Sequence, residues 1–191
     1  MRSIRASICA SLLAACTTLP PYTVPAPGHP RQGLVVVDID GTLTPHDSAF
    51  LEAREGAAQA LAAYVRKGYA VVYLSARVPL LQQGLPDWLR RHGFPDGPLH
   101  VAQSADERAR VDRFKADVLR VYALQGWRLA FAYGDSSTDF QAYAEAGFRA
   151  DQVYAIRRRG DPDCQPGPYV LCLEGWTGPL PGLERELAPT R

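Results

Sequence analysis

A run of apolar residues that ends in two aspartates, Gly-Leu-Val-Val-Val-Asp-Ile-Asp at positions 33–40, constrains the fold of this chain more than any other feature. Its β-branched residues follow one another without polar residues at alternate positions, which is typical of a strand buried on both faces. Comparable runs occur later, at 69–77, 97–102, 127–134 and 151–156. Segments with helical spacing separate these runs. The alternation predicts an α/β fold, a Rossmann-like parallel sheet sandwiched by helices.

Helices are expected between and after these strands. Apolar residues recur at helical spacing in 48–68 and, most clearly, in 106–126. The region 79–94 contains Pro86, so it predicts one or two helical segments broken near that residue. A short helix is expected at 140–148.

The first sixteen residues have the pattern of a targeting segment. A basic start precedes an apolar stretch that is too short to cross a bilayer as a helix, which takes about 20 residues. The stretch ends in Leu-Ala-Ala-Cys and resembles the lipobox of bacterial lipoproteins. That resemblance implies a signal peptide at 1–15 and a lipid on Cys16, facing the periplasm of a bacterial envelope, with the outer membrane favoured over the inner. An ordinary secretory signal or a chance apolar start are the alternatives.

The rest of the chain divides into a tether and one domain. Residues 16–32 contain five prolines without a periodic pattern, which indicates an extended Pro-rich tether. Residues 33–191 are long enough for a single domain with its own core. Loss of Arg2 and Arg5 with the signal leaves 19 basic and 20 acidic residues, a net charge of −1. This balance gives no indication of a nucleic-acid partner.

Two cysteines remain in the expected domain. Cys164 and Cys172 enclose a loop that contains Pro and Gly. In an oxidising compartment this spacing favours a disulfide, with two free thiols as the alternative.

Polar loops follow the first, second and fourth expected strands. They read Asp-Ile-Asp-Gly-Thr at 38–42, Ser-Ala-Arg at 75–77 and Gly-Asp-Ser-Ser-Thr-Asp at 134–139. In open α/β sheets the site lies beyond the carboxyl ends of the strands, so we expect the three loops to converge. Carboxylates clustered there suit Mg²⁺, and a carboxylate beside a metal and phosphate-neutralising groups suits phosphoryl transfer through an aspartyl-phosphate.

Four motifs in order resemble those of the haloacid dehalogenase (HAD) superfamily. They are DIDGTLT, YLSAR, the lysine of RFKADVL, and GDSSTD. The resemblance implies that Asp38 is the nucleophile and a Mg²⁺ ligand, and that Asp40 is the general acid/base. We expect Asp40 to bind the metal as well. Asp135 would complete the metal site and Asp139 would support it.

The same resemblance assigns the phosphate-binding groups. Ser75 and Lys115 would hold the transferring phosphoryl group. Gly41, Thr42 and Arg77 are expected to support the site, and Arg77 to contact the phosphate or its head group. Each residue has a structural alternative, such as a helix cap for the aspartates or a solvated charge for the lysine. If the helical register differs, Arg113 replaces Lys115.

A narrower resemblance concerns the lipin-type phosphatidate phosphatase domain. It rests on the second threonine of DIDGTLT, Thr44, on GYAVVYLSAR, FPDGPL and DFQAY. One departure is Gly134-Asp135, where lipins tend to have Gly-Asn. Only 34 residues separate Asp40 from Ser75 and 37 separate Arg77 from Lys115, so neither gap leaves room for a cap domain.

The sequence thus predicts a capless, Mg²⁺-dependent phosphatase that acts on phosphatidate or a related phospholipid at a membrane. The alternatives are a soluble phosphomonoesterase for nucleotides or sugar phosphates, and a non-catalytic phosphatidate-binding module. The arginines 157–159 either face anionic lipid or form an ordinary solvated surface, with the latter favoured.

Overall fold

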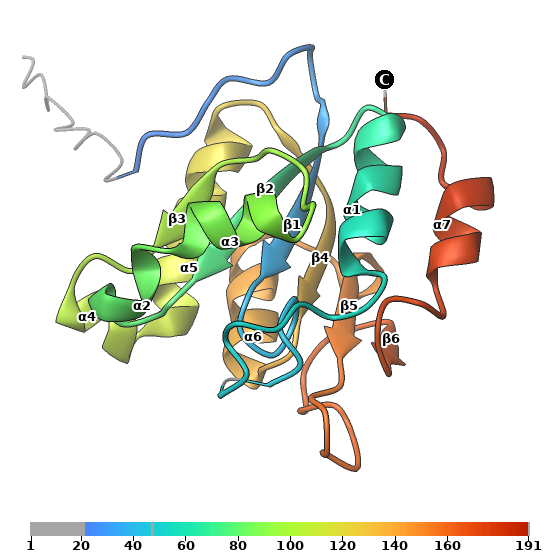
Figure 1. The fold of residues 1–191 in the computed structure, drawn as a ribbon. Coiled ribbons are helices and arrows are strands. Elements are labelled where there is room, and N and C mark those ends of the chain that lie inside the picture. Colours follow the sequence, from blue (N-terminus) through green and yellow to red (C-terminus); the bar gives the residue numbers. More distant parts are fainter. Residues whose placement is uncertain (1–21, 47, 191) are drawn as a thin grey trace, which may run out of the picture.

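The computed structural model describes residues 22–46 and 48–190. They form a parallel sheet of six strands with helices on both faces, as Figure 1 shows. This confirms the expected α/β, Rossmann-like architecture. The strand order is β3-β2-β1-β4-β5-β6. The strands are β1 (Gly33–Asp38), β2 (Ala70–Ser75), β3 (Leu99–Val101), β4 (Arg128–Gly134), β5 (Val153–Ile156) and β6 (Leu171–Leu173).

Two layers of helices cover the sheet. The core on one face includes α1 (Ala57–Arg66), α3 (Leu85–Arg91) and α7 (Leu180–Glu186). The core on the other face includes α5 (Val111–Leu124) and α6 (Ser137–Ala146). The remaining helical turns are short: α2 (Pro79–Gln82), α4 (Ala105–Ala109) and the 3₁₀ helix η1 (Ala150–Gln152).

Strand β1 explains why its sequence lacks alternation. All six of its residues are buried. Val35 and Val37 contribute to the core beneath α1, while Leu34 and Val36 contribute to the core beneath α5. Since both faces are covered, apolar residues are favoured at every position until the strand ends in Asp38. The ladder pairs Asp38 with Leu74 and Val37 with Tyr133, so the carboxyl ends of β1, β2 and β4 lie together.

The prediction of a helix at 48–68 is wrong for the first half of that segment. Helix α1 begins only at Ala57, because Gly56 has a left-handed φ of 78°. The preceding segment instead folds over the loop that follows β1, where the Arg54 amide donates to the Leu43 carbonyl at 2.7 Å. A tertiary contact therefore overrides the local helical pattern.

Other element boundaries differ by less. The helix expected at 106–126 is divided into α4 and α5 at Arg110, whose backbone is not helical. The region 79–94 contains two helices, which was one of the two predictions made for it, and the helices are separated at 83–84. Strand β6 and helix α7 were not expected, because a strand of three residues and a helix that starts Leu-Pro-Gly carry little periodic signal.

The described part of the expected tether, residues 22–32, contains neither helix nor strand, yet its beginning lies against the domain. Val24 is buried, and the Tyr22 ring packs edge-on against Phe114 with centroids 5.9 Å apart. Trp127 Nε1 donates to the Pro25 carbonyl at 2.8 Å. The expected signal peptide and Cys16 lie outside the described residues. Within the part that is described, no helix is long and apolar enough to cross a membrane.

Candidate active site

The polar loops predicted from the sequence meet at the carboxyl edge of the sheet. Asp38 and Ser75 end β1 and β2, Asp135 follows β4, and Lys115 projects from α5. Asp38, Lys115 and Asp135 line a pocket of about 380 Å³, and Ser75 lies behind it. Its lining includes Asp38, Asp40, Arg77, Val78, Leu81, Lys115, Asp135, Asp139 and Arg158.

A buried lysine lies between two buried carboxylates. Lys115 Nζ contacts Asp38 Oδ1 and donates to Asp139 Oδ1 at 2.6 Å. Burial alone would lower the pKa of the ammonium, but Asp139 and Asp38 outweigh it and raise the pKa of Lys115. Lys115 is therefore charged, and the alternative of a solvated helix charge does not hold. Arg113, its rival in sequence, has a side chain that is 65% exposed.

Asp139 is fixed by the start of α6. Its Oδ2 accepts from the amides of Asp135 and Ser136, at 3.3 and 3.2 Å, and from Ser136 Oγ at 2.8 Å. Burial raises the pKa of a carboxyl, but Lys115 and these hydrogen bonds outweigh it and lower the pKa of Asp139. Both oxygens of Asp139 are engaged within the protein, so this residue holds Lys115 and the loop in place.

Asp135 has a different environment. Burial and the charge of Asp139 raise the pKa of Asp135 to about 7, although Arg158 Nε contacts its Oδ2 and lowers it. Thr42 Oγ1 approaches the other oxygen at 3.4 Å. The sequence did not assign Arg158 to this site.

The carboxylates of Asp38, Asp135 and Asp139 form a cluster that can hold a cation. One oxygen of each lies within 4.8 Å of the others, and all three residues are buried. Asp38 Oδ2 is buried without a hydrogen-bond partner among the described residues, which is costly for a polar atom. Burial and the charge of Asp139 raise the pKa of Asp38 well above its ordinary value. A hard divalent cation between Asp38 and Asp135 would relieve both effects, so these residues fit Mg²⁺.

Asp40 is not part of this cluster. Its carboxylate accepts from Ser75 Oγ at 3.0 Å and from Arg77 Nε at 2.7 Å. Ser75 Oγ in turn accepts from the Arg77 amide at 3.1 Å. The Asp40 side chain is 24% exposed and borders the pocket, which suits a group that exchanges protons with a ligand. A metal contact of Asp40 and a phosphate contact of Ser75 stay predictions.

The turn after β1 depends on glycine. Gly41 has a φ of 80°, and a Cβ at this position would collide with the Asp135 carboxylate. The Gly41 amide donates to Thr44 Oγ1 at 2.9 Å. Thr44 thus has a structural role in closing the loop that carries Asp40 and Thr42.

Comparison with known proteins assigns the family. The family model described as the LNS2 domain of PITM 1-3 matches residues 35–157, which include every motif of the pocket. The chain belongs to this family. The Drosophila melanogaster protein retinal degeneration B is 28% identical over 160 residues, covering 81% of this chain and 12% of that protein. The human membrane-associated phosphatidylinositol transfer protein 3 is 27% identical over 157 residues, covering 78% and 15%. This LNS2 chain thus spans less than a sixth of either relative.

Solved structures agree on the fold of the LNS2 domain. A HAD-like phosphatase from Mesorhizobium loti superposes with a TM-score of 0.58 at 16% identity, covering 82% of this chain and 86% of that one. Phosphoserine phosphatase from T. onnurineus gives 0.51 at 13% identity, covering 81% and 95%. The HAD-like fold predicted from the four motifs is therefore shown.

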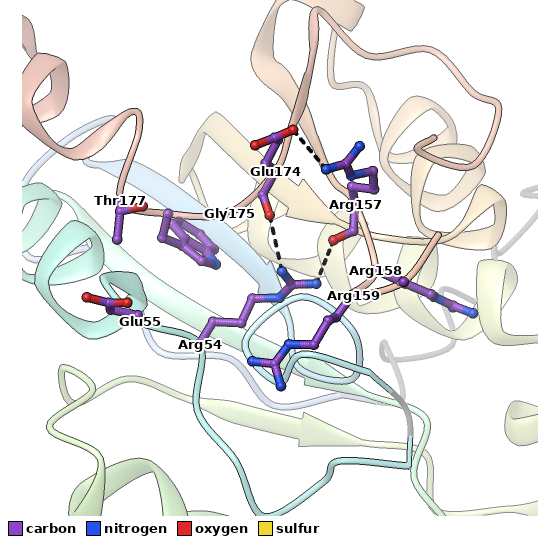
Figure 2. A pocket seen from close by; sticks show the side chains of 10 residues that line it. Arg54, Glu55, Arg157, Arg158, Arg159, Glu174, Gly175 and Thr177 are labelled. Carbon is purple, nitrogen blue, oxygen red and sulfur yellow. Dashed lines mark hydrogen bonds and ion pairs between the residues drawn. The ribbon is translucent and has the colours of Figure 1, made fainter. Parts of the chain in front are cut away.

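Arg54 organises the edge of the LNS2 site, and no sequence motif assigned it a role. Its Nη2 donates to the carbonyls of Gly41 at 2.8 Å and Arg157 at 2.7 Å, and its Nε donates to that of Thr44 at 3.0 Å. Further contacts reach the carbonyls of Pro45 and Glu174. Figure 2 shows the guanidinium between the ends of β5 and β6. One side chain thereby ties the turn after β1 to two neighbouring strands.

The three consecutive arginines after β5 each have an acidic partner. Arg157 pairs with Glu174 at 2.8 Å, Arg159 pairs with Glu52 at 3.3 Å, and Arg158 contacts Asp135. In Figure 2 their side chains spread in different directions. They therefore do not form one basic patch. The expected solvated surface fits Arg159, whose side chain is 68% exposed, but not Arg158, whose side chain is 20% exposed and pairs with buried Asp135.

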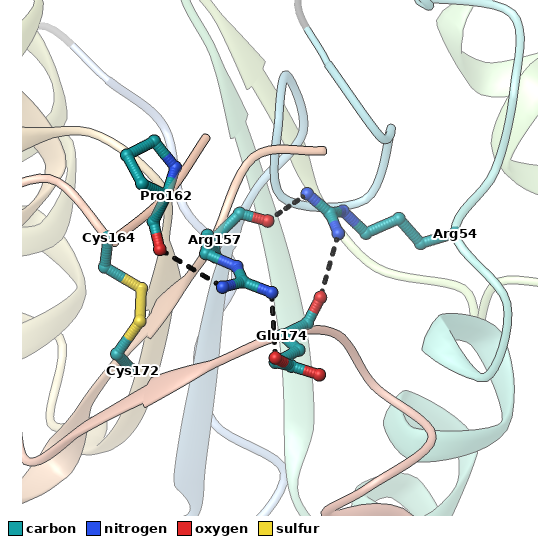
Figure 3. Close-up of a disulfide and its surroundings, with 6 residues drawn as sticks. All are labelled: Arg54, Arg157, Pro162, Cys164, Cys172 and Glu174. Atoms are coloured by element: carbon teal, nitrogen blue, oxygen red, sulfur yellow. Dashed lines mark hydrogen bonds and ion pairs between the residues drawn. A yellow bond between two sulfur atoms is a disulfide. The ribbon is translucent and has the colours of Figure 1, made fainter. Parts of the chain in front are cut away.

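Cys164 and Cys172 form a disulfide, with Cα atoms 5.9 Å apart, which confirms the pairing expected from their spacing. The bond closes the loop between β5 and β6. Figure 3 shows Arg157 beside it, donating to the Pro162 carbonyl at 3.2 Å and to Glu174. The disulfide lies outside the pocket lining and supports the loop rather than the chemistry.

Proposed function

We propose that the chain is a phosphatase that uses Asp38 as its nucleophile. The observation that carries the proposal is the Asp38 carboxylate, which is buried at the end of β1. Its Oδ1 is held by Lys115, and its Oδ2 has no hydrogen-bond partner among the described residues. A carboxylate positioned in this way can attack phosphorus, and it forms a covalent intermediate that water then hydrolyses.

The neighbouring residues have separate roles in phosphoryl transfer. Lys115 neutralises the charge on the phosphoryl group beside Asp38, and Arg77 and Ser75 orient the group from the end of β2. Asp40, held by these two residues, donates a proton to the leaving oxygen and later accepts one from the attacking water. Asp139 keeps Lys115 in position.

Mg²⁺ is the proposed cofactor, held by Asp38 and Asp135. When bound, it supplies positive charge that offsets the repulsion between the carboxylates and the phosphate. Arg158 contacts one oxygen of Asp135 and would hold this carboxylate in place beside the cation.

The proposed substrate is phosphatidate or a related phospholipid. Two observations support it. The matched human relative is named a membrane-associated phosphatidylinositol transfer protein. Val78, Leu81 and Val111 add apolar side chains to a pocket that also holds charged groups. No cap covers the site among the described residues, since the segment between β1 and β2 consists of a loop and α1. A phosphate on a membrane can reach such a site.

The second candidate is a module that binds phosphatidate without cleaving it, because the matched human relative is named a transfer protein. A soluble phosphomonoesterase is the third. One assay separates them: phosphate release from vesicle-borne phosphatidate and from a panel of nucleotides and sugar phosphates, with Mg²⁺ and with EDTA. We expect Mg²⁺-dependent release from phosphatidate. Binding without release supports the module, and preference for the panel supports the phosphomonoesterase.

We also propose that a lipid on Cys16 anchors the protein to the bacterial envelope, facing the periplasm. The basis is the pattern of residues 1–16 alone. Metabolic labelling with a fatty acid tests it, with Cys16→Ser as control. Label on the wild type but not on the variant is expected, and equal label on both contradicts the anchor.

A further inference from the structure

The pocket at the end of β1 has apolar side chains on one side and hydroxyl groups on the other. Strand β1, which ends in Asp38, lies between β2 and β4 in the sheet (Figure 1). Val78 and Leu81 follow β2 and line the pocket on one side of Asp38. Ser136 and Thr138 follow β4 and line it on the other side. A ligand whose phosphoryl group lies at Asp38 therefore has hydroxyl groups beside it.

Thr138 lies nearer to the mouth of the pocket than the charged groups do. It belongs to the first turn of α6 and is exposed, whereas Asp38, Lys115 and Asp139 are buried. The buried groups form the floor of the pocket, where the phosphoryl group is expected. In a phosphomonoester the leaving alcohol extends from the phosphorus toward the mouth. The leaving alcohol is therefore the part of a substrate that reaches Thr138.

The hydrogen bonds at the start of α6 fix the direction of the Thr138 hydroxyl. Ser136 Oγ donates to Asp139 Oδ2 at 2.8 Å and accepts from the Asp139 amide at 3.3 Å. It also lies 2.9 Å from Thr138 Oγ1. A hydroxyl has one hydrogen and two lone pairs. Since the only hydrogen of Ser136 goes to the carboxylate, the second lone pair of Ser136 accepts the hydrogen of Thr138.

The charge of Asp139 is the reason for this direction. Its other oxygen, Oδ1, accepts from the Lys115 ammonium at 2.6 Å. An ionised carboxylate only accepts hydrogen bonds, and bonds to it are about twice as strong as bonds between neutral groups. Donation therefore runs from Thr138 through Ser136 to Asp139. Thr138 Oγ1 has given up its only hydrogen, and no other described residue forms a hydrogen bond with this atom, so it offers the pocket lone pairs alone.

We propose that Thr138 accepts a hydrogen bond from a hydroxyl group on the leaving alcohol, and that it thereby selects phosphomonoesters that carry such a hydroxyl. The inference rests on the proposed phosphatase function and narrows its substrate class. A lipid whose head group is a phosphorylated glycerol has this hydroxyl, and so does a soluble glycerol or sugar phosphate. Phosphatidate gains nothing from Thr138, because the oxygens next to its phosphate are ester oxygens that only accept.

The chain of hydrogen bonds favours such a ligand. A hydroxyl that donates to Thr138 extends a chain that passes through Ser136 and ends on the charge of Asp139. Each bond in a chain of this kind polarises the next and strengthens it. A ligand oxygen that can only accept meets the lone pairs of Thr138 instead, and no bond forms.

The alternative is that Thr138 only stabilises the start of α6 through its bond to Ser136. In that case, loss of the hydroxyl lowers the turnover of every substrate by the same factor. A selective role changes the ratio between two substrates that differ in one hydroxyl. This ratio does not depend on the amount of folded enzyme, so it separates the two roles.

The test measures kcat/KM in Mg²⁺ on two matched pairs of substrates. The soluble pair is glycerol phosphate and propyl phosphate. The lipid pair consists of phospholipids in phosphatidylcholine vesicles whose head groups are phosphorylated glycerol and phosphorylated propanediol, which lacks the central hydroxyl. Calorimetry with the phosphonate analogues of the soluble pair, which a phosphatase does not cleave, measures binding without turnover.

Four proteins are compared: the wild type, Thr138→Val, Thr138→Ser and the control Thr23→Val. Valine keeps the shape of threonine but lacks the hydroxyl, whereas serine keeps the hydroxyl. Thr23 is exposed in the tether and does not line the pocket, so its replacement controls for the loss of a surface hydroxyl.

We expect the wild type to prefer the hydroxyl-bearing member of a pair about fivefold, which corresponds to one neutral hydrogen bond. Thr138→Val should abolish the preference, and Thr138→Ser and Thr23→Val should keep it. The pair with the faster turnover shows whether the substrate is a lipid or a soluble ester. An equal preference in Thr138→Val and the wild type overturns the inference, as does a wild type that shows no preference in turnover or binding. If no substrate releases phosphate, the proposed phosphatase function fails, and binding of the phosphonate pair still decides whether Thr138 recognises the hydroxyl.

Discussion

Replacement of Lys115 by methionine tests the electrostatics of the site. Methionine keeps much of the side-chain volume but removes the charge that lies between two buried carboxylates. Breaking a buried ion pair by removing one partner costs about 3–5 kcal/mol, because the remaining charge is left without compensation. We therefore expect the free energy of unfolding to fall by about this amount at pH 7.

The loss should depend on pH in a defined direction. Lys115 lowers the pKa of Asp139 in the wild type, so without it the pKa of this buried carboxyl rises above its unfolded value. A carboxyl whose folded pKa is raised destabilises the protein progressively as pH rises through that pKa. The gap between variant and wild type should therefore be smaller at pH 5 than at pH 8.

Urea denaturation in EDTA at the two pH values measures the effect. With a slope of about 2 kcal/mol per M, the midpoint should shift by roughly 1.5–2.5 M at the higher pH. Arg113→Met is the control, because Arg113 makes an exposed pair with Asp117 at 3.8 Å and should change stability by less than about 1 kcal/mol. Equal losses in the two variants, or a loss that does not vary with pH, would refute the reasoning.

Three further predictions concern Arg54, Asp135 and the disulfide. Arg54→Gln should lower the free energy of unfolding by about 2 kcal/mol, because backbone carbonyls of three segments lose their donor. It should also weaken Mg²⁺ binding at least several-fold, as measured by calorimetry. Unchanged Mg²⁺ affinity would show that Arg54 only stabilises the fold. Mg²⁺ should raise the melting temperature more at pH 8 than at pH 5.5. The pKa of Asp135 is raised to about 7, so its ionised form destabilises the metal-free protein as pH rises. An equal shift of the melting temperature at the two pH values contradicts this. The free energy of unfolding of the double variant Cys164→Ser/Cys172→Ser should fall by about 2.5 kcal/mol, the loop entropy for a separation of 8 residues. Its turnover per folded molecule should stay unchanged. Lost turnover would place the loop in the site.

The strands of this fold could be predicted from the sequence because their signal is local. Strand β1 is apolar at every position up to Asp38, and the ends of β2 and β4 carry polar motifs at the edge where a parallel sheet places its site. This placement predicted that Asp38 and Asp135 lie together, the resemblance of the motifs added Lys115, and the structure places all three residues in one pocket.

What could not be predicted depends on tertiary contacts. The start of α1 follows from the position of Arg54 over the turn after β1, and nothing in the local sequence marks that arginine. The partners of Asp40 were missed as well, because Ser75 and Arg77 reach it from a neighbouring strand. Arg158 was seen only as part of a charge run, although it reaches Asp135.

The central claim is that Asp38 carries the phosphoryl group. The most direct measurement is mass spectrometry of the protein quenched during turnover of phosphatidate in Mg²⁺, with the Asp40→Asn variant used to slow release of the group. The account predicts one added phosphoryl group on the peptide that contains Asp38, and neither the adduct nor phosphate release in Asp38→Asn. Phosphate release by Asp38→Asn at the wild-type rate would contradict it.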